Sequence, residues 1–324
     1  MLTEEKYWDQ LAPTWDKKIT SKRNPHYHYY HTIDLLVIQL LQETKAKKAL
    51  EIGCGTAGCA INVLKTLKRD NIHITGIDIS KKMIKFGREK IKKANLEDKI
   101  SLEVGNATDL PFQDKEFDMV FSRGGVLSYT TEPSKLLQQI KRVLCIGGVI
   151  GLDVIPKPPK GKDYYIGKIS DSPSNKEVFQ VESTSLMYEE FYTDGFVQVA
   201  RKYHVKSDAN LYNELQTLFQ KLPSSLPGIL QPPIHLKEAQ LISDRSVTLY
   251  SINKIQEKMT EVGFQITDVY GTGYANLMSK NSEIFEFVTA NRDKFSRIEI
   301  ILHKVLCLDS ASMLFITGKK CEKC

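Results

Sequence analysis

With 324 residues, a net charge of +6 and 41% hydrophobic residues, the chain has the composition of a soluble globular protein with one large domain or two. Its six cysteines are scattered without the pattern of a disulfide scaffold, and no run of residues is long and apolar enough to span a membrane. The first residues lack an apolar signal region, so we expect a reducing, cytoplasmic location. The mild positive charge requires neither nucleic acid nor a membrane as a partner.

The first 45 residues are expected to be helical and to precede the main domain. Tyr7, Trp8 and Trp15 have a spacing that places them near one face of a helix, and a second helix is predicted from about Thr32 to Thr44. The first helix either covers a ligand site or simply packs on the sheet.

The segment Lys48–Cys59 combines a short apolar run, a glycine-rich turn and the beginning of a helical pattern. Ala49–Ile52 predicts a buried strand, and apolar residues at helical spacing follow from Ala60. Gly53 and Gly55 permit the backbone angles of a tight turn and the close approach of a ligand. The spacing also fits the dinucleotide fingerprint G-x-G-x-x-G, which is a weak signal by itself.

Glu51, two residues before Gly53, distinguishes between two kinds of nucleotide ligand. A carboxylate at this position would repel a pyrophosphate, whereas it suits a cationic group such as the amino group of S-adenosylmethionine (SAM). The run Glu-x-Gly-x-Gly-Thr resembles motif I of the class I SAM-dependent methyltransferases, although Ala57 stands where the family often has a third glycine. The resemblance implies that Glu51, Gly53 and Gly55 bind SAM.

Residues 72–79 predict a second strand that ends in Asp78 and Ile79, and Ser80 is a suitable N-cap for a lysine-rich helix over residues 81–94. An acid at this strand end can accept hydrogen bonds from both ribose hydroxyls, in dehydrogenases as well as in methyltransferases. We therefore expect Asp78 and Ile79 to bind the cofactor, the alternative being that Asp78 only caps the helix. The basic residues of the helix indicate a solvated face rather than a nucleic-acid site.

A third strand is predicted over residues 100–104, and the stretch Gly105–Phe112 follows it. This stretch resembles the family motif Gly-Asp-Ala-x-x-Leu-Pro-Phe, in which the acid and the next backbone amide contact adenine. Asn106 replaces the acid here, and we expect its oxygen, together with Ala107, to bind the adenine.

The fourth predicted strand, residues 117–123, ends where the transferring methyl group is expected, because open α/β sheets bind ligands at the carboxyl edge of their strands. We expect Ser122 to bind the cofactor and Arg123 and Tyr129 to contact the acceptor. The alternative to an acceptor contact is that Arg123 forms an ion pair at the surface.

A helix from Pro133, stopped by Gly147 and Gly148, and a fifth strand over residues 149–155 complete the first half of the sheet. The end of this helix resembles the family segment Arg-Val-Leu-Lys-Pro-Gly-Gly. Four family motifs in the expected order thus cover about residues 48–155.

At Pro156 the alternation of strands and helices stops for roughly ninety residues, which is long for a loop in a compact domain. Strands over 177–182 and 196–205 and a helix over 210–222 are predicted in this stretch. We read it as an inserted cap that carries substrate specificity, the alternative being a packing or dimerisation module.

The sheet is expected to resume with a helix over 251–262, closed by Gly263, and strands over 264–270 and 312–318, with helical residues 282–306 between them. The resemblance implies that the last strand lies antiparallel beside the fifth. The predicted fold class is α/β, a Rossmann-like seven-stranded methyltransferase sheet with helices on both faces and an inserted α+β cap. The predicted divisions are 1–45 (helical lid segment), 46–155 (SAM-binding core), 156–250 (inserted cap and substrate domain) and 251–320 (completion of the core).

Pro25–His31 contains three histidines and three tyrosines. His28 and His31 are candidates for a base or polar anchor on the acceptor side, and packing is the alternative. No metal site is predicted, because no other group supplies matching ligands. Cys321 and Cys324 have a metal-like spacing but are read as part of a terminal tail.

The expected function is a SAM-dependent methyltransferase that transfers a methyl group by in-line displacement to a small-molecule, lipid-like or peptide acceptor. The segment Tyr7–Trp15 resembles the leader of methyltransferases related to the ubiquinone and menaquinone enzymes, which implies that Trp15 helps to close the cofactor site. The fourth strand lacks the signatures of nucleic-acid methyltransferases. An NAD(P)-dependent oxidoreductase and a non-catalytic SAM-binding regulatory protein remain as alternatives, and the protein is expected to be a monomer or homodimer.

Overall fold

The computed structural model describes most of the chain outside residues 157–249. The described residues are 4–20, 26–67, 69–156, 164–168, 176–180, 188–190, 201–203, 250–273, 287–288, 290–304, 306, 308, 311 and 313–321. The chain divides into a large unit, Glu4–Lys157 with Thr248–Cys324, and a smaller unit that covers Pro158–Val247.

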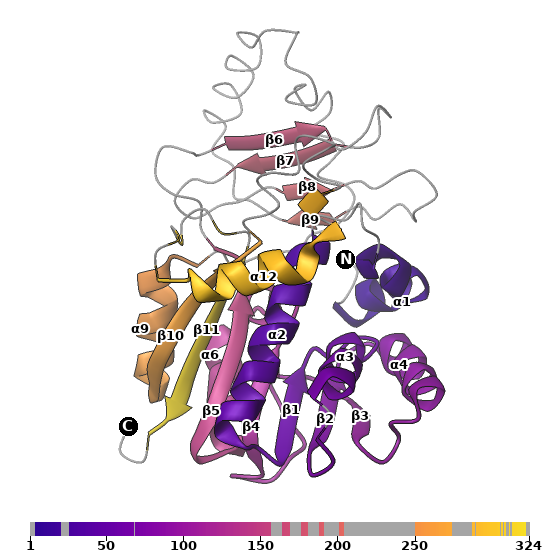
Figure 1. Cartoon of the computed structure of the whole chain (residues 1–324), viewed down its shortest axis with the longest axis vertical. Helices are drawn as coiled ribbons and strands as arrows, with labels where there is room; N and C mark the ends of the chain where they lie inside the picture. The colour runs from indigo at the N-terminus through magenta and orange to yellow at the C-terminus, as the bar shows by residue number, and fades with distance from the viewer. Residues whose placement is uncertain are drawn as a thin grey trace, which may run out of the picture. The chain divides into compact units, whose positions relative to one another are not determined.

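The large unit is built on a seven-stranded sheet with the strand order β10-β11-β5-β4-β1-β2-β3 (Figure 1). The five strands β5, β4, β1, β2 and β3 are parallel to one another, whereas β11 is antiparallel to both β5 and β10. This topology confirms the predicted fold class, including the insertion of the last strand antiparallel beside the fifth. The strands are β1 Lys48–Ile52, β2 His73–Asp78, β3 Ile100–Val104, β4 Phe117–Ser122, β5 Leu144–Val154, β10 Phe264–Thr272 and β11 Met313–Lys320.

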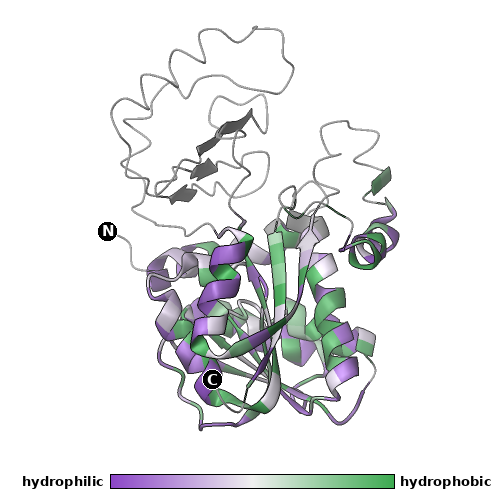
Figure 2. Ribbon diagram, turned by 90° about the vertical axis from the view of Figure 1, so that its left-hand side faces the viewer, coloured by the Kyte–Doolittle hydropathy of each residue, from purple (hydrophilic) through white to green (hydrophobic). Residues whose placement is uncertain are grey.

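Helices cover both faces of this sheet. One hydrophobic cluster joins it to α2, α3 and α4, and a second cluster joins the opposite face to α5, α6 and α9. Figure 2 shows that hydrophobic residues are concentrated on the strands between these layers. The helices are α1 Glu4–Thr20, α2 His26–Thr44, α3 Gly58–Leu67, α4 Lys81–Ala94, α5 Val126–Tyr129, α6 Pro133–Val143, α9 Ile252–Val262 and α12 Arg292–Ile301.

Local sequence signals account for the ends of several helices. The Ser80 hydroxyl accepts a hydrogen bond from the Met83 amide at the start of α4, as its expected N-cap role requires. Ser251 caps α9 in the same way, and Gly263 ends that helix in the left-handed region at φ 103°. These helices therefore begin and end close to their predicted positions.

Two elements are longer than predicted. α2 begins at His26 rather than near Thr32, because Tyr29 and Tyr30 are buried and extend its apolar face. β5 begins at Leu144, where the backbone is already extended at the end of α6, and it includes the two glycines predicted to precede it. The pairing of β5 with β4 is irregular between Phe117 and Met119, which accommodates the additional residues.

The smaller unit contains a four-stranded antiparallel sheet in the order β6-β7-β8-β9. β7 overlaps the predicted strand 177–182 and β9 lies within 196–205, whereas the predicted helix 210–222 falls outside the described residues. The reading of 156–250 as a substrate cap stays a prediction. The strands are β6 Tyr164–Lys168, β7 Lys176–Gln180, β8 Tyr188–Glu190 and β9 Arg201–Tyr203.

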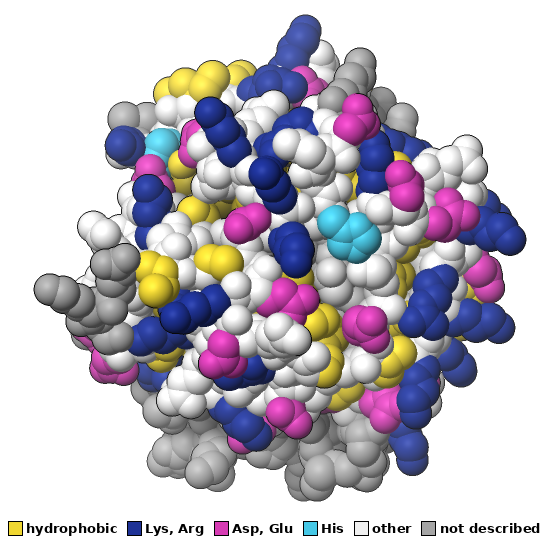
Figure 3. Space-filling view, turned by 90° about the horizontal axis from the view of Figure 1, so that it is seen from below, with side chains coloured by type: hydrophobic (Ala, Val, Ile, Leu, Met, Phe, Trp, Pro, Cys, Tyr) yellow, Lys and Arg dark blue, Asp and Glu magenta, His cyan; other side chains and the backbone are white. Residues whose placement is uncertain are grey.

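The surface of the large unit carries charges of both signs. On the face drawn in Figure 3, Lys and Arg side chains alternate with Asp and Glu side chains. Among the described residues, no helix combines the length and the apolar character that crossing a membrane requires.

Candidate functional site

A cavity lies at the carboxyl ends of β1, β2, β3 and β4, entirely within the large unit. This is the edge at which open α/β sheets bind ligands. Residues that follow each of the four strands line the cavity, and α1 adds Trp8 and Trp15. The sequence motifs described above therefore converge on one site.

The turn between β1 and α3 has a conformation that depends on its glycines. Gly53 and Gly55 both have positive φ, at 65° and 53°. A Cβ atom on Gly53 would clash with a methyl group of Val126, so a side chain there would force Val126 to shift as well as strain the turn. Ala57, the departure from the family motif, also adopts a positive φ of 59° and is fully buried. The turn thus forms without the third glycine. Ala57 adopts a left-handed backbone conformation there, which is strained for a residue other than glycine.

Glu51 lies at the end of β1 with 1% of its surface exposed, and its Oε2 atom has no hydrogen-bond partner among the described residues. Burial raises the pKa of its carboxyl group from 4.5 to about 8, although nearby Arg123 and the backbone amide of Ala60 oppose the shift. A buried carboxylate oxygen without a partner is costly. Because Glu51 lines the cavity, a cationic ligand group would supply the missing partner.

Arg123 follows β4 and also lines the cavity, but it is not a surface ion pair. Its Nη1 atom donates to both carboxylate oxygens of Asp34 on α2, at 2.8 and 3.0 Å, and the two side chains are 9% and 6% exposed. Its guanidinium carbon lies 4.9 Å from the centre of the Tyr30 ring. Sequence reasoning missed Asp34, although an acid within the apolar run of α2 signals a buried partner.

Asp78 ends β2 beneath the glycine turn. Its Oδ2 accepts from the amide of Gly55 at 2.8 Å, and its Oδ1 accepts from the amide of Ser80 at 2.9 Å. Burial raises the pKa of Asp78 to about 6, with these two amides opposing the shift. Ser80 caps α4 with its own hydroxyl, so Asp78 is left to fix the turn and to face the cavity, which Ile79 also lines.

Asn106 and Ala107 line the cavity after β3. The Oδ1 atom of Asn106 already accepts hydrogen bonds from the amide and the hydroxyl of Thr108, both at 3.0 Å. Both lone pairs of this oxygen are therefore used, contrary to the expectation that it accepts from an adenine amino group. The side chain offers its amide NH₂ group instead, which suits a ring nitrogen of a base.

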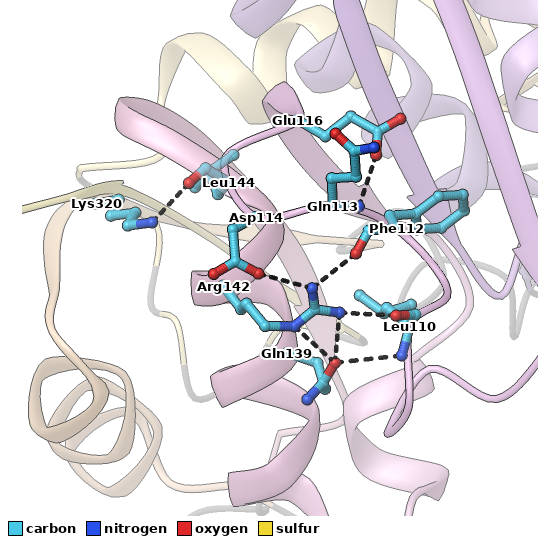
Figure 4. Close-up of polar contacts among 9 residues, drawn as sticks. All are labelled: Leu110, Phe112, Gln113, Asp114, Glu116, Gln139, Arg142, Leu144 and Lys320. Carbon is cyan, nitrogen blue, oxygen red and sulfur yellow. Dashed lines mark hydrogen bonds and ion pairs between the residues drawn. The ribbon is translucent and has the colours of Figure 1, made fainter.

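An arginine on α6 holds the loop that carries Asn106 (Figure 4). Arg142 donates to the backbone oxygens of Leu110 and Phe112, both at 2.7 Å, and to the side chains of Asp114 and Gln139. Gln139 in turn accepts from the amide of Leu110. The family-like segment at the end of α6 thus positions the third motif through side-chain contacts.

α1 borders the cavity and is attached to the core by two acids that sequence reasoning missed. Asp9 accepts from the Ser80 hydroxyl at 2.5 Å and from the Lys82 amide at 3.0 Å. Asp16 accepts from the Thr56 hydroxyl at 2.5 Å and from the Lys90 ammonium at 2.7 Å. Both acids contact residues next to the motif I turn or the end of β2.

Both tryptophans of α1 face the cavity. The Trp15 indole nitrogen lies 3.6 Å from the position of a Cβ on Gly55, and the Trp8 ring meets the rings of Trp15 and Tyr129 edge to face. Tyr129 on α5 lines the cavity beside them. Trp15 thus borders the glycine turn, and Tyr129 lies on the side where acceptor contacts are predicted.

Ser122 is buried and does not line the cavity. Its hydroxyl donates at 2.9 Å to Asp153 on β5, which also accepts from the amides of Gly124 and Gly125. Burial raises the pKa of Asp153, and these donors oppose the shift. The side chain of Ser122 therefore helps to fix the loop after β4 and does not line the cavity, and its predicted contact with the cofactor stays a prediction.

His31 does not line the cavity either. Its Nε2 atom lies 3.4 Å from a carboxylate oxygen of Asp293 on α12, and burial lowers its pKa. Among the described side chains of this segment, Tyr30 lines the cavity, whereas His31 faces α12. The side chain of His28 lies outside the described residues, as does Cys324.

Comparisons with known proteins agree with this geometry. The profile of the methyltransferase domain family matches residues 43–215, which is more than half of the chain. The demethylmenaquinone methyltransferase of Listeria welshimeri is 33% identical over 146 residues, which cover 44% of this chain and 58% of that protein. The ajmaline N-methyltransferase of Rauvolfia serpentina is 27% identical over 164 residues, covering 44% and 54%. The chain therefore matches little more than half of the length of these relatives.

Solved structures share the fold at low sequence identity. The CcbJ methyltransferase of Streptomyces caelestis superimposes with a TM-score of 0.61 at 14% identity, covering 99% of this chain and all of the other. A SAM-dependent methyltransferase of Clostridium acetobutylicum gives 0.52 at 14% identity, covering 90% and 92%. The fold is the one that these methyltransferases share. The chain belongs to the methyltransferase domain family.

Proposed function

We propose that the protein binds SAM in this cavity and transfers its methyl group to a small-molecule or lipid-like acceptor. The observation that carries the proposal is the buried carboxyl oxygen of Glu51, which has no hydrogen-bond partner in the part of the chain that the structure describes. Glu51 lines the same cavity as the glycine turn and Asp78. A phosphate-bearing dinucleotide would be repelled by Glu51, whereas the methionine portion of SAM presents a cationic amino group. The residues present therefore fit SAM better than NAD(P).

Each lining residue has a role that its surroundings support. Glu51 binds the amino group, and Gly53 and Gly55 allow the ligand to approach the backbone. Asp78 accepts from the ribose hydroxyls with the lone pairs that Gly55 and Ser80 do not use. The base lies against Ile79, Asn106 and Ala107, with the Asn106 amide as a donor.

SAM supplies an activated methyl group, so the protein has only to align the acceptor with it and exclude water. Trp15 borders the glycine turn and Trp8 packs against its ring edge to face, and we assign to these two rings the exclusion of water. Tyr30 and Tyr129 line the cavity on the side that we assign to the acceptor. This aromatic lining favours an apolar or aromatic acceptor.

The names of the relatives indicate acceptors as different as demethylmenaquinone and ajmaline. The proposal for this chain is therefore limited to the small-molecule or lipid-like class, with a peptide acceptor as a further outcome of a screen. The smaller unit is the segment to which we assign acceptor specificity.

Calorimetric titration of the protein with SAM, S-adenosylhomocysteine, NAD and NADP tests the cofactor. Binding of the two adenosyl ligands without comparable binding of NAD or NADP is expected, and a preference for a nicotinamide cofactor would refute the proposal. A screen of acceptors with methyl-labelled SAM then tests transfer. SAM binding without transfer to any acceptor class would favour a regulatory SAM-binding protein instead.

A further inference from the structure

The part of the cavity next to the start of α3 contains an acidic and a basic side chain, Glu51 and Arg123, that are not hydrogen-bonded to each other. Glu51 presents the unpartnered oxygen described above. Arg123 is held at Nη1 by Asp34, and its Nη2 atom makes no hydrogen bond with the described residues. Both side chains are more than nine-tenths buried and both line the cavity. A ligand that satisfied this region would carry a cation and an anion side by side.

The free guanidinium nitrogen lies beside the N-terminus of α3. Nη2 of Arg123 is 3.0 Å from the position of a Cβ on Gly58, the first residue of this ten-residue helix. The first turn of a helix carries partial positive charge on its amide groups, so an anion placed there interacts with the helix and with Arg123 together. The absence of a side chain on Gly58 leaves the approach open.

Asp34 determines which part of Arg123 is available. Both of its carboxylate oxygens accept from Nη1, which orients the guanidinium group and leaves Nη2 for another partner. Asn62 in turn donates to Asp34 at 3.1 Å.

We propose that Arg123 binds the α-carboxylate of the methionine portion of SAM, with Asp34 as its positioning residue, while Glu51 binds the α-amino group. This assignment rests on the proposed function and replaces the expectation that Arg123 contacts the acceptor. It makes the site selective for a zwitterionic amino-acid end. An adenosyl ligand without the carboxylate would leave the Arg123 nitrogen unpaired in a buried position.

The test compares SAM with decarboxylated SAM, which keeps the adenosine, the sulfonium and the amine but lacks the carboxylate. The readout is the ratio of their dissociation constants, measured by calorimetry for each variant. A hydrogen bond between charged groups predicts that the wild type prefers SAM by at least about tenfold. In Asp34→Asn/Arg123→Gln, which removes both charges of the pair together, the ratio should fall to about one while decarboxylated SAM binds as before.

Two further variants keep the test decisive. Arg123→Lys retains the positive charge and replaces the paired substitution if that variant does not fold. Its preference for SAM over decarboxylated SAM should be reduced by at least about threefold, because one ammonium group cannot bind Asp34 and the ligand in the way that a guanidinium group does. Arg88→Gln is the control, because Arg88 is an exposed residue of α4 outside the cavity. It should leave the ratio of the two dissociation constants unchanged. An undiminished preference in both Arg123 variants would overturn the assignment. Failure of the wild type to bind SAM or S-adenosylhomocysteine would instead refute the proposed function.

Discussion

Replacing Glu51 by Gln is expected to stabilise the ligand-free protein at alkaline pH. Burial raises the pKa of this carboxyl group from 4.5 to about 8, so the folded chain binds the proton more tightly than the unfolded chain. Between these two pH values unfolding releases a proton, and the stability therefore falls as the pH rises. Each pH unit costs about 1.4 kcal/mol, or about 5 kcal/mol over the whole interval.

The assay is urea unfolding at pH 6, 7 and 9 without cofactor, because Gln does not titrate. The free energy of unfolding of Glu51→Gln minus that of the wild type should grow by about 3 kcal/mol between pH 6 and 9. The difference cancels the titration of buried groups that do not interact with Glu51, such as His31. Glu103→Gln, which changes an exposed carboxylate outside the cavity, is the matched control. If the difference for Glu51→Gln varied no more with pH than that of this control, the burial argument for the cationic ligand group would fail.

Three further substitutions test other parts of the site. Asp78→Asn removes the charged ribose acceptor and should weaken S-adenosylhomocysteine binding at least about tenfold in calorimetry, with a folded circular-dichroism spectrum; unchanged affinity would leave Asp78 a purely structural role. Asp16→Asn weakens the attachment of α1 at Thr56 and Lys90, so S-adenosylhomocysteine should dissociate at least about threefold faster in stopped-flow tryptophan fluorescence. Glu5→Gln, which changes only an exposed ion pair of the same helix, should leave that dissociation rate unchanged. Equal dissociation rates in the wild type, Asp16→Asn and Glu5→Gln would show that α1 does not control the release of S-adenosylhomocysteine. Arg142→Met should lower the free energy of unfolding by about 2–3 kcal/mol, because several acceptors around the loop after β3 lose a charged donor. Lys135→Met on the same helix is the matched control, and an equal loss there would contradict the role given to Arg142.

The part of the cavity proposed to bind the cofactor could largely be predicted because its signals are local in the sequence. Glu51, Gly53 and Gly55 lie within one strand and its turn, and Asp78 ends the next strand along the chain. Parallel strands bring their carboxyl ends to one edge, so contiguous motifs were sufficient to place these residues in one cavity. The helix signals at Ser80 and Gly263 are equally local.

The roles of single side chains at the margins of the site were not predictable in this way. Asn106 has the expected position, but its oxygen is used by Thr108, two residues further on. Ser122 ends the expected strand, but its hydroxyl faces Asp153 in the core. In a strand or turn the side-chain direction depends on neighbouring elements, and these are distant in the sequence.

The sequence by itself determined the sheet, the glycine turn and the acids at the ends of β1 and β2, because each depends on residues close together in the chain. Only the tertiary structure decided what Arg123 and His31 do. Packing of α2 against the sheet places Asp34 on Arg123, 89 residues away, and packing of α12 against α2 places Asp293 near His31, 262 residues away. Which face of α2 meets which neighbour depends on the fit of buried side chains over whole helices, and this fit exists only in the folded chain.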